Sequence, residues 1–309
     1  MNLILLVVGF ALLIGGADLL VRGASAIARY FGLSPLVIGL TVVAFGTSSP
    51  ELFVSTVAAY KGSFDVALGN VIGSNIFNIA VIIGVAALIT PIKVGAGLVK
   101  RDLPIMNSFL IAFYLASLNR TITKVEGGVL FLALCGYLQL MYFVAKKQHL
   151  EKVFTSSAEK NELSLLKSII FTLGGILGLV FGGDLVVDSA VKIARIIGVS
   201  QLVISALIVA AGTSLPELAT TVVAAFKKQP DLALGNAIGS NIFNVGAVIG
   251  VSALVSPIKV SHLALSFDMF YMIGVCLFSW FLMSINLKVG RLKALLLLLT
   301  YIYYISASL

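Results

Sequence analysis

The residues best suited to chemistry in this chain are two glutamates inside long apolar segments. Glu51 and Glu217 lie 166 residues apart, and neither residues 35–60 nor residues 201–226 contain a lysine or arginine that could neutralise them. At the depth of a bilayer, an ionised side chain costs at least about 2.5 to 3.5 kcal/mol. We expect the compensating partner to be a cation from solution. The alternative is a protonated carboxyl group that is hydrogen-bonded between helices.

Oxygen-bearing side chains accompany both glutamates at helical spacing. Each glutamate follows a threonine by four residues, and in a later stretch of each half an asparagine follows a serine by four. The four pairs are Thr47 and Glu51, Ser74 and Asn78, Thr213 and Glu217, and Ser240 and Asn244. Residues four apart share one face of a helix. Hydroxyl, amide and carboxylate oxygens are ligands of hard cations such as Ca²⁺ and Na⁺, and these stretches contain no His or Cys. The pattern therefore predicts a site for hard cations.

A proline directly precedes each glutamate. Pro50 and Pro216 cannot donate a backbone hydrogen bond, and a glycine stands four residues before each of them. We expect both helices to break here and to free backbone carbonyls for an ion, such as those of Ala44 and Ala210. Unwound backbone is tolerated at this depth where it lines a cavity. A simple kink is the alternative.

The elements that must position these residues occur twice. Residues 67–78 and 233–244 agree at eleven of twelve positions, and the offset of 166 residues continues without a gap from Asp18 and Asp184 to Asp102 and Asp268. The chain is therefore a duplication, and its function is expected to lie between the two halves.

The composition places the chain in a membrane. Sixty per cent of the residues are hydrophobic, 11% are charged, and the mean hydropathy is +1.11. A soluble globular protein has about a quarter of its residues charged. The net charge of +8 does not indicate nucleic acid, because the basic residues are scattered between apolar runs. The two cysteines fit neither a disulfide framework nor a tetrahedral metal site. Residues 1–14 lack a basic start, so we interpret them as a first spanning helix and not as a cleaved signal.

Segments of about 20 apolar residues divide the chain into ten expected spans. Their limits are 2–22, 35–60, 66–90, 103–118, 125–145, 168–190, 201–226, 232–256, 263–284 and 291–308. Each half holds five spans. Because five is odd, the second half must enter the membrane upside down. The predicted fold is an all-α integral membrane protein with ten transmembrane helices in two inverted five-helix repeats, with broken helices at the ion site. The repeats are residues 1–145 and 168–309, joined by a linker at 146–167.

The distribution of basic residues predicts the orientation. If the N-terminus is outside, 15 of the 21 lysines and arginines fall on the cytoplasmic side and six on the other. Cytoplasmic loops carry the excess of basic residues. We therefore expect a multi-pass protein of the cell (plasma) membrane with both termini outside and a cytoplasmic central linker.

Two pairs of motifs resemble a known family. Residues 46–51 and 212–217 read Gly-Thr-Ser-x-Pro-Glu, and residues 69–76 and 235–242 read Gly-Asn-x-Ile-Gly-Ser-Asn-Ile. They resemble the two alpha-repeats of the cation/calcium antiporter superfamily, and most of all its sodium/calcium exchanger branch, in the prokaryotic form without a regulatory domain. The resemblance covers nearly the whole chain.

The resemblance implies a secondary antiporter that uses no cofactor, is not an enzyme and needs no obligate protein partner. Three Na⁺ would exchange for one Ca²⁺, and the first and sixth helices would slide across a core that holds the ions. Glu51 and Glu217 would bridge the ion sites. The other oxygens would come from the side chains or carbonyls of Thr47, Ser48, Ser74, Asn78, Thr213, Ser214, Ser240 and Asn244, and from the carbonyls of Ala44 and Ala210.

The chain departs from the family pattern at two places. Sodium/calcium exchangers often carry an acidic residue at one of the positions matching Asn78 and Asn244, whereas both are amides here. The site would then hold a charge of −2, which balances one Ca²⁺ but alters the balance among three Na⁺. The linker of about twenty residues also leaves no room for the large Ca²⁺-sensing domains of animal members.

Three other functions are weighed against Na⁺/Ca²⁺ exchange. A proton-coupled cation antiporter would usually show Gly-Asn-Ala shortly before the glutamate, which this chain lacks. An intramembrane protease would need a zinc motif, or the Gly-x-Gly-Asp pattern that Phe181 interrupts before Asp184. A passive channel also needs oxygen-lined sites, so it is distinguished only by flux that is independent of a counter-ion.

Overall fold

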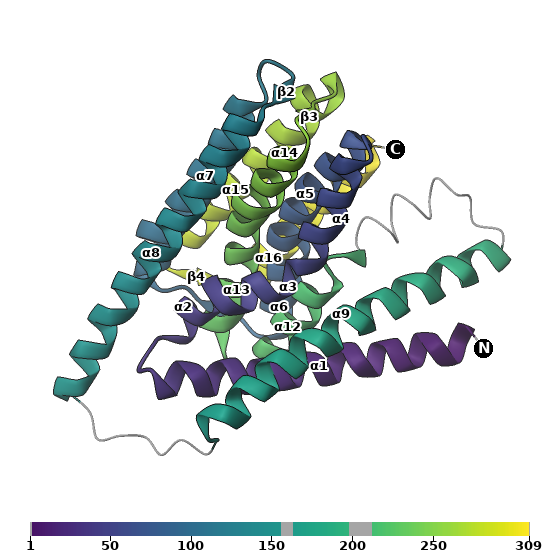
Figure 1. Cartoon of the computed structure of the whole chain (residues 1–309). Helices are drawn as coiled ribbons and strands as arrows, with labels where there is room; N and C mark the ends of the chain where they lie inside the picture. Colours follow the sequence, from purple (N-terminus) through teal and green to yellow (C-terminus); the bar gives the residue numbers. More distant parts are fainter. Residues whose placement is uncertain (1, 156–162, 198–211, 309) are drawn as a thin grey trace.

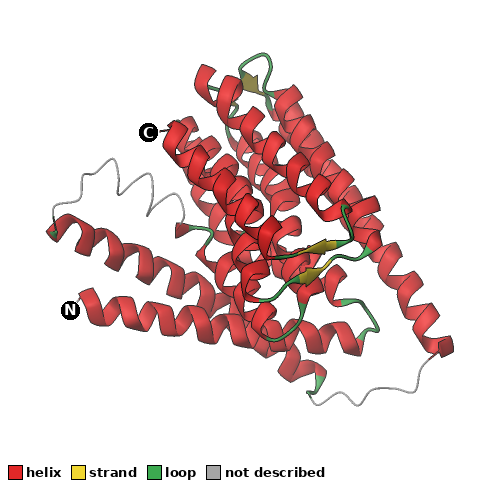
Figure 2. Ribbon diagram, turned by 180° about the vertical axis from the view of Figure 1, so that it is seen from behind, coloured by secondary structure: helices red, strands yellow, loops and turns green. Residues whose placement is uncertain are grey.

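The computed structural model describes residues 2–155, 163–197 and 212–308, and this part of the chain is almost entirely helical (Figures 1 and 2). Among these residues, six helices are long and apolar enough to cross a membrane, or seven if one bent helix pair counts as a single span. The six are Asn2–Tyr30, Phe64–Ile89, Lys124–Lys147, Leu165–Ile196, Pro230–Val255 and Ala264–Ser284. The chain is therefore a multi-pass membrane protein.

Two long helices lie side by side and cross the rest of the bundle obliquely. They are α1 (Asn2–Tyr30) and α9 (Leu165–Ile196), and Figure 1 shows them together at one side of the steeper core helices. Glycines allow their backbones to touch. A Cβ on Gly16 would lie 2.8 Å from the Gly175 carbonyl oxygen, and a Cβ on Gly175 would lie 2.5 Å from the Leu20 backbone nitrogen. Small residues permit such close packing in a bilayer, where lipid supplies no hydrophobic drive between helices.

The first glutamate stands directly after a bend in a spanning segment. This segment contains α2 (Pro35–Ile38), the π-helix η1 (Gly39–Val43), α3 (Ala44–Thr47) and α4 (Ser49–Tyr60). Its two parts, Pro35–Thr47 and Ser49–Tyr60, meet at an angle of 46°. Pro50 lies in the first turn of α4, where its missing N–H costs no helical hydrogen bond. The predicted break is therefore present, one residue before α4 begins.

The second half shows the same helix start at the matching position. Helix α12 (Leu215–Phe226) has Pro216 in its first turn, and its preceding residue Ser214 has φ −88° and ψ 7°, close to the −84° and 6° of Ser48. Both glutamates thus occupy the first turn of a helix. Helix N-termini carry a partial positive charge that favours carboxylates there.

Two spans run through the centre of the bundle, and both change helix type at the second predicted motif. The first comprises α5 (Phe64–Phe77), η2 (Asn78–Ile82) and α6 (Ile83–Ile89). The second comprises α13 (Pro230–Phe243), η5 (Asn244–Ile249) and α14 (Gly250–Val255). The most apolar windows of these spans are 72% and 83% buried, against 28 to 33% for the other four. The π-helices of these two central spans begin at predicted ligands, Asn78 and Asn244, and such segments often mark functional sites.

The remaining helices enclose this centre. They are η3 (Leu98–Asp102), α7 (Leu103–Ala116), α8 (Lys124–Thr155), η6 (Ala264–Asp268), α15 (Met269–Ser284) and α16 (Arg291–Ser308). Helix α8 continues to Thr155, past the predicted start of the linker at residue 146. The first and sixth predicted spans are also exceeded, because α1 reaches Tyr30 and α9 reaches Ile196.

Two small antiparallel sheets join the halves. Strand β1 (Ile92–Lys93) pairs with β4 (Lys288–Val289), and β2 (Thr121–Ile122) pairs with β3 (Ile258–Lys259). Figure 1 shows β2 and β3 at one end of the bundle and β4 toward the other. Each sheet therefore takes one strand from each half.

Candidate ion-binding centre

Each glutamate is buried and held by a serine from the opposite half of the chain. Glu51 is 0% exposed and Glu217 is 1% exposed. The Ser48 hydroxyl donates to Glu217 Oε1 at 3.0 Å, and the Ser214 hydroxyl donates to Glu51 Oε1 at 3.2 Å. These bonds are equivalent under the offset of 166 residues. The two motifs therefore meet face to face, as the duplication predicts.

The predicted serines of the central spans join the same hydrogen-bond network. The Ser214 hydroxyl also contacts Ser74 Oγ at 2.9 Å. The Ser240 hydroxyl donates to Glu217 Oε1 at 3.4 Å and lies 3.5 Å from Thr47 Oγ1. These five residues are all buried or nearly so. The structure thus brings α4, α5, α12 and α13 together around the two carboxylates.

The predicted threonines donate to asparagines across the same interface. Thr47 Oγ1 donates to Asn236 Oδ1 at 3.1 Å, and Thr213 Oγ1 donates to Asn70 Oδ1 at 2.9 Å. Asn70 and Asn236 are absent from the predicted ligand set. The signal that could have found them is their place in the twelve-residue repeat, where they occupy matching positions.

The predicted ligands Asn78 and Asn244 lie in a cluster of four buried amides. Asn78 Nδ2 donates to Asn241 Oδ1 at 3.0 Å, and Asn244 Nδ2 donates to Asn75 Oδ1 at 3.3 Å. Asn75 and Asn241 were also not predicted, although they too occupy matching positions in the repeat. The cluster crosses between the halves, as the serine–glutamate contacts do.

Four buried acceptor oxygens of the predicted set have no hydrogen-bond partner among the described residues. They are Glu51 Oε2, Glu217 Oε2, Asn78 Oδ1 and Asn244 Oδ1. A buried acceptor without a donor loses its hydration at a cost of about 1 to 3 kcal/mol, and more when it is charged. A bound cation would replace that hydration. These atoms fit Ca²⁺ or Na⁺ as metal ligands, since all of them are oxygens and two belong to carboxylates. Within the described ranges, no group of three or more His, Cys, Asp or Glu could hold a metal ion.

Contrary to our expectation, the bend does not free the backbone carbonyl of Ala44 from hydrogen bonds. The Ala44 carbonyl accepts the Ser48 N–H at 2.9 Å and the Thr47 hydroxyl at 3.4 Å, because the helix continues to Thr47 before it bends. In a continuous helix the carbonyl of Gly46 would accept the N–H of residue 50. Because residue 50 is a proline and has no N–H, the Gly46 carbonyl lacks this donor. Ala210, the matching prediction in the second half, lies outside the described residues.

The two sides of the centre differ. A cavity of about 360 Å³ borders it on one side, and its lining includes Pro50, Thr213, Pro216, Asp184 and Asp188. On α1, the residue that matches Asp184 forms ion pairs instead. Asp18 pairs with Arg22 at 2.8 Å and with Lys227, which follows the end of α12. The first contact lies within α1, whereas the second ties α1 to the core.

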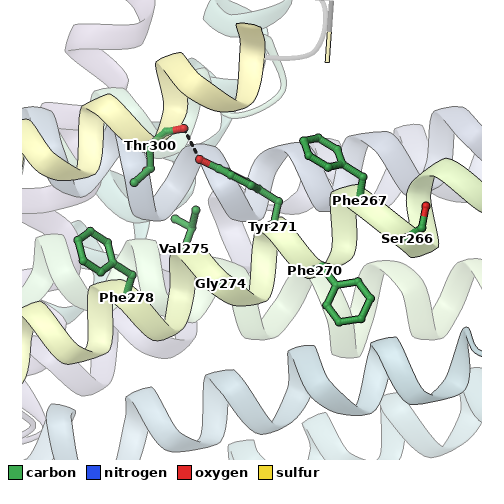
Figure 3. A pocket seen from close by; sticks show the side chains of 8 residues that line it. All are labelled: Ser266, Phe267, Phe270, Tyr271, Gly274, Val275, Phe278 and Thr300. Atoms are coloured by element: carbon green, nitrogen blue, oxygen red, sulfur yellow. Dashed lines mark hydrogen bonds between the residues drawn. The ribbon is translucent and has the colours of Figure 1, made fainter. Parts of the chain in front are cut away.

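A second pocket, of about 420 Å³, is unsuited to ions. Figure 3 shows it along η6 and α15, where Phe267, Phe270 and Phe278 contribute aromatic side chains. The Tyr271 hydroxyl donates to the Thr300 carbonyl of α16. Its lining includes no charged side chain. The oxygen cluster between the two halves is therefore the better candidate for cation binding.

Comparison with known proteins gives concordant matches. The family model described as "Sodium/calcium exchanger protein" matches residues 1–143 and 167–309. The putative antiporter CaxA of Alkalimonas amylolytica is 37% identical over 97% of this chain and 96% of its own length. The sodium/calcium exchanger MaX1 of Methanosarcina acetivorans is 32% identical over 98% of this chain and 97% of its own. A solved structure of the sodium-calcium exchanger NCX_Mj, soaked with Na⁺ and Ca²⁺, superposes with a TM-score of 0.85 at 33% identity and covers 99% of this chain and 97% of that one.

Proposed function

Because this chain belongs to the sodium/calcium exchanger family, we propose that the oxygen cluster between its halves is where Na⁺ and Ca²⁺ bind in turn. The protein is a membrane antiporter of these two ions, which are its substrates, and it is not an enzyme. The proton-coupled alternative is not favoured by these relatives. The proposed export of Ca²⁺ would be driven by Na⁺ moving down its inward gradient.

The observation that carries the site assignment is the set of four acceptor oxygens without donors. Two belong to Glu51 and Glu217 and two to Asn78 and Asn244, so both halves contribute alike. Their combined charge of −2 balances one Ca²⁺. We assign supporting oxygens to the remaining predicted residues, which are Thr47, Ser48, Ser74, Thr213, Ser214 and Ser240. The Ala44 and Ala210 carbonyls stay candidate ligands, the first through its remaining lone pair.

We further propose that the two halves are inverted five-helix repeats, giving ten spans in total. Reciprocal contacts such as Ser48 with Glu217 and Ser214 with Glu51 support a two-fold relation between them. The two sheets at different ends of the bundle, each with one strand from either half, support its inversion. The repeats comprise residues 1–145 and 168–309, with the linker at 146–167.

The asymmetry around the centre supports alternating access in which α1 and α9 slide across the core. The Asp18–Lys227 ion pair ties α1 to the end of α12 on one side, while the cavity with Asp184 lies beside α9. With both termini outside and the linker cytoplasmic, as the basic residues predict, the ion pair lies on the cytoplasmic side of the cell membrane. The cavity then faces outside, and this conformation is outward-facing.

The test of function is Ca²⁺ uptake by proteoliposomes that are loaded with Na⁺ and diluted into Na⁺-free medium. We expect rapid uptake of radioactive Ca²⁺ that requires internal Na⁺ and persists when an ionophore collapses the pH gradient. Uptake driven by a proton gradient alone would contradict Na⁺ coupling. Flux that is independent of any counter-ion would indicate a channel.

The two amides at the centre lead to a prediction about Na⁺. In Asn244→Asp the charge of the site becomes −3, which matches three Na⁺ better than one Ca²⁺. We expect the Na⁺ concentration for half-maximal Ca²⁺ uptake to fall at least about threefold, which corresponds to roughly 0.7 kcal/mol. The measurement is a Na⁺ titration of initial uptake rates.

A surface substitution is the control for Asn244→Asp. Asn119 is exposed, and its side-chain oxygen accepts the Thr121 N–H at 3.1 Å, which a carboxylate can also do. Asn119→Asp therefore adds the same charge away from the centre and should leave the Na⁺ titration unchanged. Identical Na⁺ titrations for Asn244→Asp and the unmodified protein would refute a role of Asn244 in Na⁺ binding.

A further inference from the structure

Two asparagines outside the predicted ligand set lie directly behind two of the proposed ligands. Asn241 accepts from the side-chain nitrogen of Asn78, and Asn75 accepts from that of Asn244. All four side chains are buried, with at most 1% of their surface exposed. An amide presents either an oxygen or a nitrogen to a neighbouring ion, so its rotation decides whether it can bind a cation.

The first pair is fixed by a backbone carbonyl. Asn241 Nδ2 donates to the Asn75 carbonyl oxygen at 3.2 Å. A carbonyl only accepts, so Asn241 must direct its nitrogen there and its oxygen toward Asn78. Asn78 must then donate with its own nitrogen, because a flipped amide would place two oxygens against each other. Its Oδ1 is left as the acceptor without a protein donor.

The second pair is fixed by a sulfur atom. Asn75 Nδ2 donates to Met272 Sδ at 3.5 Å, and a thioether can only accept. Asn75 therefore offers its oxygen to Asn244 Nδ2, and Asn244 Oδ1 is the second amide oxygen without a donor. In both halves a proposed ligand is thus left with its amide oxygen free of a donor. The acceptor that fixes the second asparagine is a backbone carbonyl for Asn241 and a thioether sulfur for Asn75.

The threonine ligands show a parallel arrangement. Asn236 Nδ2 donates to the Glu217 backbone carbonyl at 3.3 Å, which directs its Oδ1 to the Thr47 hydroxyl. Likewise, Asn70 Nδ2 donates to the Glu51 backbone carbonyl, and Asn70 Oδ1 accepts from the Thr213 hydroxyl. The Thr213 hydroxyl donates to Asn70, and the Thr47 hydroxyl donates to Asn236 at 3.1 Å or to the Ala44 carbonyl at 3.4 Å. Because each hydroxyl proton is directed at a protein acceptor, the oxygen lone pairs are left for a cation.

We propose that Asn75 and Asn241 are positioning residues that hold the amides of Asn244 and Asn78 with their oxygen atoms toward the transported cation. This inference rests on the proposed function, since it assumes that Asn78 and Asn244 are ligands. Residues that orient metal ligands in this way typically contribute about 10- to 100-fold to affinity.

A double-mutant cycle between Asn241 and Asn78 tests the proposal. Asn241→Ala frees the Asn78 amide to turn, so we expect the Kd for Ca²⁺ to rise about 10- to 100-fold. In the Asn78→Asp background the same alanine substitution should not raise Kd, because either oxygen of a carboxylate can face the cation and the loss of Asn241 removes an oxygen that lies against the carboxylate. The measurement is equilibrium binding of radioactive Ca²⁺ to purified protein, together with the KM for uptake.

A structural role would give a different pattern. If Asn241 only fills space, Asn241→Ala should cost the same in both backgrounds, and that additivity would overturn the proposal. Asn107 provides the control, since it is 2% exposed and its amide donates to the Leu103 carbonyl of its own helix. Asn107→Ala should leave Kd unchanged in either background.

The reciprocal cycle gives a second test if Asn241→Ala fails to fold. Asn75→Ala should raise the Kd for Ca²⁺ by a similar factor, and Asn244→Asp should remove most of that effect. Failure of the proposed function has its own signature, because the unmodified protein would then bind no Ca²⁺. Normal binding with additive cycles would overturn the positioning role alone.

Discussion

Glu51→Gln and Glu217→Gln are each expected to lower Na⁺-driven Ca²⁺ uptake by more than about 100-fold while the protein stays folded. Each substitution removes half of the charge that compensates Ca²⁺, at a carboxylate that is at most 1% exposed. Removing one partner of a buried ion pair costs about 3 to 5 kcal/mol, which corresponds to a factor of more than 100 in affinity. Glutamine keeps the shape of the side chain and an oxygen that can accept from Ser214 or Ser48.

The measurement for the glutamates is initial uptake in proteoliposomes, with the thermal unfolding midpoint as the test of folding. Ca²⁺ should raise that midpoint in the unmodified protein and not in the variants, because a ligand that binds only the folded state stabilises it. Glu126 is a matched control, since its carboxylate accepts the Thr123 N–H at 2.8 Å at the start of α8. Glu126→Gln keeps this bond and should transport normally. Full activity in Glu51→Gln or Glu217→Gln would refute the site.

Much of the candidate site could be predicted because the duplication shows which residues must face one another. Two copies of one motif predict matched contacts, and Ser48 with Glu217 and Ser214 with Glu51 are such a pair. The sequence alone does not distinguish a proposed ligand from a residue that we propose to orient it. Asn78 and Asn241 are the same residue type within repeats of one segment, and only the direction of each amide distinguishes them.

Helix limits and helix type were less predictable. Hydropathy reports how long an apolar run is, so it predicts that a span exists between residues 66 and 90. Hydropathy does not indicate that the α-helix changes to a π-helix at Asn78. Hydropathy also cannot detect that α8 continues as a helix to Thr155, because polar residues outside the membrane can extend a helix. The helical hydrogen bond at the Ala44 carbonyl could not be predicted, because a proline shows that a helix is interrupted but not at which residue it bends.

The close packing of α1 and α9 bears directly on the proposed motion. A sliding pair must hold together while it moves against the core, and the glycines that bring its backbones into contact supply that cohesion. A Cβ at Gly16 would lie 2.8 Å from two backbone atoms, the Gly175 oxygen and the Leu179 nitrogen. Neither atom can move without its helix. A side chain at Gly16 must therefore separate the two helices.

Gly16→Leu is accordingly expected to lower the thermal unfolding midpoint and to reduce Ca²⁺ uptake at least about tenfold. Overpacking of a close interface typically costs about 1 to 3 kcal/mol, which is enough for a tenfold change. The neighbouring residue is the control. Gly15 is exposed, and no described atom lies within 4 Å of a Cβ placed on it. Gly15→Leu should transport like the unmodified protein, because its side chain would point away from α9.

The partner helix offers the same comparison independently. Gly175→Leu would press on the Leu20 nitrogen and the Gly16 oxygen, whereas the exposed Gly174 has no described atom within 4 Å of a Cβ. We expect Gly175→Leu to lower both the initial Ca²⁺ uptake and the thermal unfolding midpoint. Gly174→Leu should match the unmodified protein in both measurements. Equal behaviour within either pair would show that contact between α1 and α9 is not needed for the transport cycle. Access to the ion cluster would then require a movement other than the joint sliding of α1 and α9. In that case α1 could move against the core without α9, by breaking its own contacts such as the Asp18–Lys227 ion pair.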